Sequence, residues 1–186
     1  NKNSSRIYAA DFGQFPGIRS YDKKFNRIAT KFSNPFGKGY QPFNVQAIGD
    51  SIFVAYAKQK SAGEEEVGFG KLAEFDENGI LIKAWNDGGH LNAPWGIALA
   101  PNNFGKLSGA LLVSNFGDGT IAAYNTKTTE FIDYLRSENG QPIKIDGIWG
   151  ILFGNGASLG DTNALYFAAG PNEEKNGLFG SLRPAK

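Results

Sequence analysis

The stretch Pro94-Trp95-Gly96-Ile97-Ala98-Leu99 decides the fold, because it returns along the chain as Ile148-Trp149-Gly150-Ile151-Leu152-Phe153. A weaker copy, Pro42-Phe43-Asn44-Val45-Gln46-Ala47, precedes both of them. The aromatic positions of the three copies are 52 and 54 residues apart. Self-similarity at a fixed period of this length is typical of repeat architectures.

Further strand-like segments follow the two full copies, three after 94–99 and two after 148–153. After 94–99 come an apolar run at 111–115, an alternating run at 119–125 and, beyond a polar turn, a segment at 131–135. Asp or Asn near Gly between alternating apolar residues is a strong hairpin signal. A unit of four short antiparallel strands, roughly 45 to 55 residues long, is a propeller blade.

The chain therefore reads as an all-β propeller of four-stranded antiparallel blades. We expect a partial blade at 5–32, blades at 43–86 and 93–135, and a partial blade at 147–183, with three, four, four and three strands. That is about 3.5 blades of a six-bladed ring, and rings of this kind have roughly 4 to 8 blades.

Fewer blades than a ring needs would leave apolar blade faces and strand edges exposed. We therefore expect a complementing polypeptide segment that supplies the missing N-terminal half of the ring. It would be a cleaved partner or further sequence upstream. Self-association of two identical arcs is disfavoured, since the first blade would still lack its inner strand.

The composition excludes several functions. The formal net charge is +1 and no basic stripe is visible, which argues against nucleic-acid binding. No apolar stretch approaches the roughly 20 residues that a membrane span requires. The absence of cysteine excludes a disulfide scaffold and a thiolate metal site. Asn3-Ser4-Ser5 forms a glycosylation sequon.

Four longer phrases resemble an uncharacterised family of secreted NHL-like six-bladed β-propeller proteins. They are APWGIALAP (93–101), GALLVSNFGDGTIAAYN (109–125), IDGIWGILFGNG (145–156) and LYFAAGPNEEKNGLFGSL (165–182). The resemblance covers about residues 7–182. It implies a propeller fold and an extracellular or periplasmic setting. The family has no established reaction, so the resemblance assigns no catalytic residue.

Candidate ligand-binding residues are sought at the ends of inner strands and on the loops over one face. They are Trp95, Trp149, His90, Asn115 and Asp118. The two tryptophans would stack against a sugar or an aromatic ligand, although packing between neighbouring blades is the favoured interpretation. His90, the only histidine, would serve as a general base if a carboxylate oriented it, or as a hydrogen-bonded loop residue.

A calcium site is the second candidate. Asp11 and Asn115 end equivalent strands and Asp118 lies close by, so these oxygens are candidate Ca²⁺ ligands. The alternative is that Asp118-Gly119 is a tight turn and Asn115 caps a strand end. Segment 63–70, which contains Glu64-Glu65-Glu66, is predicted to be a long loop that binds something or is a tolerated insertion.

Three functions remain open. The first and preferred one is a secreted binding or scaffold module that presents loops and a central channel to a protein, a glycan or a small ligand. The second is a calcium-dependent propeller hydrolase or lyase, and the third is a lectin-like defence protein. Whether any catalysis occurs is left open by the sequence.

Overall fold

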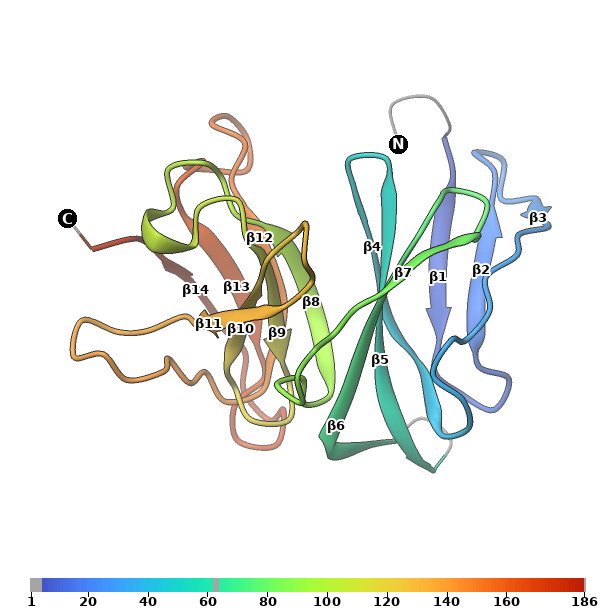
Figure 1. The fold of residues 1–186 in the computed structure, drawn as a ribbon, viewed down its shortest axis with the longest axis horizontal. Helices are drawn as coiled ribbons and strands as arrows, with labels where there is room; N and C mark the ends of the chain where they lie inside the picture. The colour runs from blue at the N-terminus through green and yellow to red at the C-terminus, as the bar shows by residue number, and fades with distance from the viewer. Residues whose placement is uncertain (1–4, 62–63, 186) are drawn as a thin grey trace.

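The structure is a computed structural model that describes residues 5–61 and 64–185. Fourteen strands lie within these residues. They form four antiparallel sheets in chain order (Figure 1). The first sheet holds β1 (Ile7–Asp11), β2 (Gly17–Tyr21) and β3 (Arg27–Ile28). The second holds β4 (Tyr40–Ile48), β5 (Ser51–Ser61), β6 (Glu64–Phe75) and β7 (Leu81–Ala84). The third holds β8 (Pro94–Leu99), β9 (Leu111–Asn115), β10 (Ile121–Tyr124) and β11 (Phe131–Tyr134). The fourth holds β12 (Ile148–Phe153), β13 (Leu165–Ala169) and β14 (Leu178–Leu182).

The strand count of three, four, four and three confirms the predicted architecture of about three and a half propeller blades. Each sheet is a simple meander, so every strand pairs with its neighbour in sequence. The inner strands β4, β8 and β12 lie next to one another, and β1 packs against β4. A short 3-10 turn at Gly105–Leu107 is the one helical element among the described residues.

The core consists of three apolar layers, one between each pair of neighbouring sheets. Strand β9 contributes to two of them, because its side chains alternate between the faces of the third sheet. Leu111 and Val113 pack toward the second sheet, whereas Leu112 packs toward the fourth. All three are almost completely inaccessible to solvent. Burial on both faces explains why β9 is a continuous apolar run instead of an alternating one.

Segment 63–70 is not a loop, so that prediction is wrong for the part that the structure describes. From Glu64 onward the segment belongs to β6, which pairs with the extended end of β5. Lys58 forms an ion pair with Glu66 directly across the hairpin, and its ammonium also lies 4.0 Å from the centre of the Phe69 ring. Such cross-strand contacts stabilise a strand that sequence alone reads as an acidic loop.

Two sequence-based predictions lie partly or wholly outside the described residues. The sequon asparagine, Asn3, falls in the undescribed segment 1–4, and residue 63 is likewise undescribed. No helix within residues 5–61 and 64–185 has the length and apolar character that crossing a membrane requires.

Candidate functional site

Five aromatic rings gather where the inner strands begin. Trp149 lies at the centre, with ring-to-ring distances of 5.7 Å to Phe43, 5.6 Å to Trp95 and 4.2 Å to Phe116. The ring of Phe12, just after β1, lies 4.7 Å from Phe43. We call these five residues the axial aromatic cluster. Their side chains are all half-buried, so part of each ring faces solvent.

A local irregularity places the three inner-strand rings. The pairing register shifts between Pro42 and Asn44, between Pro94 and Ile97, and between Ile148 and Ile151. Each shift brackets the aromatic residue of its strand. A bulge of this kind redirects one side chain out of the regular alternation. The Trp149 ring therefore contacts Phe43 of the second sheet as well as Trp95 of the third. Packing between adjacent blades alone would bring it only against the third sheet.

Polar contacts, partly or fully buried, hold the backbone at the two tryptophans. The Ser114 hydroxyl accepts a hydrogen bond from the Gly96 amide at 2.8 Å and donates one to the Trp149 carbonyl at 2.7 Å. Asn44 donates from Nδ2 to the Trp95 carbonyl at 2.8 Å. These bonds link the second, third and fourth sheets at the level of the axial aromatic cluster. The backbone that carries the two tryptophans is thus fixed by hydrogen bonds between sheets.

A carboxylate lies on the edge of the cluster. The indole Nε1 of Trp149 donates a hydrogen bond to Oε1 of Glu174 at 2.7 Å. Glu174 ends a run of three non-glycine residues with positive φ: Asn172 at 60°, Glu173 at 56° and Glu174 at 61°. A left-handed backbone costs about 1–2 kcal/mol per L-residue, so this turn is strained. Strain that survives in a folded protein is a recognised feature of ligand sites.

Asn115 acts within the polar framework beside the cluster. Its Oδ1 accepts from the Asn92 amide at 3.0 Å, and its Nδ2 donates to the His90 carbonyl at 2.9 Å and to Thr120 Oγ1 at 3.0 Å. The side chain is fully buried. Asn115 therefore holds the 90–92 segment against the loop after β9, consistent with the predicted role at a strand end.

Asp118 is exposed and belongs to the same framework. Its Oδ1 accepts from the amide and the hydroxyl of Thr120 at 3.0 and 2.6 Å, and its Oδ2 accepts from Asn92 Nδ2 at 3.2 Å. The structure thus brings Asn115 and Asp118 together through Asn92, a residue that the sequence analysis missed. Asn92 carries no motif of its own, and its position shows only once the two loops meet.

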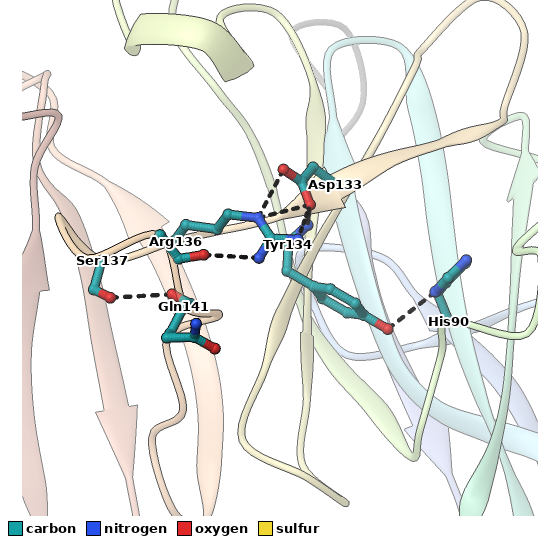
Figure 2. Close-up of polar contacts among 7 residues, drawn as sticks. His90, Asp133, Tyr134, Arg136, Ser137 and Gln141 are labelled. Carbon is teal, nitrogen blue, oxygen red and sulfur yellow. Dashed lines mark hydrogen bonds and ion pairs between the residues drawn. The ribbon is translucent and has the colours of Figure 1, made fainter.

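The ring of His90 contacts the outer strand of the third sheet. Its contacts there, with Phe131 and Tyr134, involve no carboxylate. Its ring stacks on Phe131 at a centroid distance of 3.6 Å. Nδ1 also lies 3.0 Å from the Tyr134 hydroxyl, a contact that Figure 2 draws. Its backbone carbonyl, not its ring, joins the Asn115 framework. Because no carboxylate orients the ring in these contacts, the role of His90 as a general base stays a prediction.

Asp11 is occupied by a cation of its own sheet. Arg19 forms an ion pair with Oδ2, and the Gly13 amide donates to Oδ1 at 3.0 Å. The bond from Arg19, followed by that from Gly13, lowers the pKa of the Asp11 carboxyl. Within the described residues, no group of three or more His, Asp or Glu side chains could hold a metal ion. The proposed calcium ligands Asp11, Asn115 and Asp118 therefore receive no support from their observed contacts.

Comparison with known proteins supports the fold and leaves the activity open. No protein-family model matches the chain. It is 32% identical to the uncharacterised protein R648 of Acanthamoeba polyphaga mimivirus, over 95% of this chain and 45% of that protein. It is 31% identical to the uncharacterised protein L690 of the same virus, over 96% of this chain and 49% of that protein. The chain thus spans about half the length of these relatives.

A solved structure matches over most of the chain. A luciferin-regenerating enzyme, a six-bladed propeller, superposes with a TM-score of 0.57 at 10% identity, covering 97% of this chain and 59% of the enzyme. At this identity the likeness shows the fold alone. The predicted resemblance to six-bladed propellers is therefore confirmed for the fold. Membership of the NHL-like secreted family stays a prediction.

Proposed function

We propose that this chain is a ligand-binding module of a propeller, and that the axial aromatic cluster binds a glycan. The observation that carries the proposal is Trp149. Its ring contacts rings from the second and third sheets while staying partly exposed, and its indole nitrogen is held by the strained Glu174 turn. A structure that only needed packing would not require a polar, strained loop at this ring.

The chemistry of the face suits a sugar. Aromatic rings combine an apolar face with a rigid shape, so they stack on the C–H face of a pyranose. Carboxylates accept hydrogen bonds from hydroxyl groups, and one of them, Glu174, borders the cluster. The rings are anchored to the strands, so binding requires little ordering of side chains.

The same proposal includes a complementing polypeptide segment. The chain covers 59% of the six-bladed enzyme that it superposes on and about half of each mimivirus relative. These proportions support a ring that is completed by further polypeptide. A secreted setting, which follows from the family resemblance, stays a prediction; proteomic detection of the protein outside the producing cell would test it.

Glycan binding is tested on an array and then by calorimetry with the strongest oligosaccharide from that array. Trp149→Ala should weaken the affinity at least tenfold, about 1.4 kcal/mol, and Trp149→Phe should recover part of it. Glu174→Gln should weaken binding less, because an amide oxygen still accepts from the indole. Phe25→Ala, a change at an exposed ring in the turn between β2 and β3, is the matched control and should leave the affinity unchanged.

Two outcomes would refute the glycan proposal. One is silence across the whole array. The other is an oligosaccharide whose affinity does not change in Trp149→Ala while circular dichroism shows that the variant is folded.

A further inference from the structure

Glu174, the carboxylate beside the axial aromatic cluster, carries a negative charge that no described cation neutralises. Its Oε1 accepts the hydrogen bond from the Trp149 indole at 2.7 Å, and that donor is neutral. The neighbouring lysine, Lys175, forms its ion pair with Glu173 instead, at 2.8 Å. Within residues 5–61 and 64–185 no ion pair includes Glu174, and the residue is exposed. A ligand cation that approaches Trp149 would therefore meet an unpaired carboxylate.

The turn that carries Glu174 fixes the position of this carboxylate. The Glu174 amide donates to the Gly170 carbonyl at 3.1 Å, and the Asn172 amide donates to Oδ2 of Asp146 at 3.0 Å. A Cβ atom on Gly170 would lie 3.2 or 3.3 Å from three atoms of Glu174, so the glutamate packs directly over this glycine. The backbone of the turn thus holds Glu174 where its side chain reaches the indole.

The rings of the cluster supply a second attraction for a cation. The face of an aromatic ring carries partial negative charge, and tryptophan attracts cations most strongly. A hydrogen bond from the indole N–H to a carboxylate polarises the ring and increases this charge on its face. The one cation–ring contact in the described part of the chain is that of Lys58 with Phe69, which is outside the cluster. No described side-chain cation therefore competes for the cluster rings.

The direction of the indole N–H bond sets where the two attractions meet. This bond lies in the plane of the Trp149 ring, so Glu174, its acceptor, lies at the edge of the ring and leaves the face open. A pyranose that stacks on the face would bring a substituent at its periphery toward that edge. An acidic substituent would be repelled by Glu174, because like charges in contact cost free energy. A protonated amine would be attracted by the carboxylate and by the ring.

We propose that the glycan bound by the axial aromatic cluster is an amino sugar, whose protonated amine pairs with Glu174 while its pyranose ring stacks on Trp149. The amine donates to Oε2 of Glu174, which accepts no hydrogen bond in the contacts of the described residues, and Oε1 keeps its bond to the indole. This inference rests on the glycan-binding function proposed above and names the substrate class of the same site.

Three tetrasaccharides with one backbone provide the test. The β-1,4-linked oligomers of glucose, glucosamine and N-acetylglucosamine differ only at C2, which carries a hydroxyl, an ammonium or an acetamide group. Calorimetry at about pH 5.5, where carboxylates are ionised and the sugar amines are protonated, measures the affinity of each for the intact chain. The glucosamine oligomer should bind about fivefold more tightly than the other two, as expected for an exposed ion pair. Raising the ionic strength to about 0.5 M should remove this preference by screening the charges.

Matched variants separate the carboxylate from the net charge of the turn. Glu174→Gln should reduce the affinity for the glucosamine oligomer to that for the glucose oligomer, which should itself change little because the amide oxygen still accepts from the indole. Glu173→Gln removes the same charge from the same turn, at a side chain that is 83% exposed and paired with Lys175. This control should keep the preference. Both changes preserve side-chain shape at exposed positions, so neither should unfold the chain.

Four results would overturn the inference. They are equal affinities of the three oligomers, a preference that persists in Glu174→Gln, a preference that Glu173→Gln reduces as much as Glu174→Gln does, and binding confined to glycans without an amine. In each case, binding that is lost in Trp149→Ala would leave the glycan-binding function standing. Failure of that function has a different signature, which is the absence of binding by any glycan on the array.

Discussion

Gly96 shows at the residue scale why the repeated motif has no side chain after its tryptophan. A Cβ atom at this position would lie 2.6 Å from the Ser114 hydroxyl, 2.6 Å from the Trp149 carbonyl and 2.8 Å from the Ile151 amide. Two of these atoms belong to the neighbouring inner strand, β12. The glycine therefore permits the close approach of two blades beneath the axial aromatic cluster.

Gly96→Ala should consequently destabilise the chain by about 1–3 kcal/mol, the usual cost of forcing extra volume into a packed site. Chemical denaturation of the variant measures the effect. Gly17→Ala is the matched control, because a Cβ there meets nothing within 4 Å and its φ is not positive. A Gly96→Ala variant as stable as Gly17→Ala would contradict the proposed role of the close approach.

At the scale of elements, the strands in the middle of the arc bury tyrosines between sheets. Tyr56 lies in the layer between the first and second sheets, and Tyr124 in the layer between the second and third. Both are almost completely buried. Burial raises the pKa of each phenol above its ordinary value, and the charge of Asp87 adds to the effect at Tyr124.

The raised pKa values predict a loss of stability in alkali. The folded chain keeps these phenols neutral, whereas the unfolded chain ionises them above a pH of about 10. The unfolded state then binds fewer protons, so the free energy of unfolding falls as pH rises beyond that value. Tyr56→Phe should make the decline shallower by roughly 1.4 kcal/mol per pH unit.

Urea denaturation at a series of pH values, together with phenolate absorbance, measures this slope. Between about pH 7 and 9 the variant and the parent chain should show the same pH dependence, since neither state ionises Tyr56 there. An unchanged slope above pH 10 in Tyr56→Phe would show that the phenol ionises without unfolding.

For the whole molecule, stability is distributed along the arc of sheets. Within residues 5–61 and 64–185, the second and third sheets have a neighbouring sheet on each face, whereas the first and fourth have one on a single face. Local opening free energies follow buried apolar contacts and paired backbone groups. The middle of the arc should thus be the last part to open.

Hydrogen exchange of the free chain should therefore be slowest in β5, β9 and β10 and fastest in β3 and β14. The expected difference between β9 and β14 is at least tenfold in rate. Peptide-resolved mass spectrometry measures it directly. Exchange in β14 as slow as in β9 would show that the outer edge of β14 is already covered in the free chain.

The sequence by itself determined the strand order and much of the strand boundaries. The segments 94–99, 111–115 and 148–153 are predicted with the bounds that the structure has. Their apolar character and the glycine-rich turns between them are local properties, so they can be identified from the sequence alone. The start of β6 was not predicted as a strand, because Glu64-Glu65-Glu66 has no local strand signal and its conformation depends on pairing with β5.

Only the tertiary structure decided what the candidate residues do. Trp149, Trp95 and Phe43 occupy equivalent repeat positions in the sequence, yet bulges and the arc of sheets bring their rings into one cluster with Glu174. Asp11 and Asn115 also occupy equivalent positions, but one pairs with Arg19 and the other is buried among backbone groups. Repeat periodicity specifies a residue's place within its sheet, whereas its partners come from other sheets, at distances set by packing around the axis.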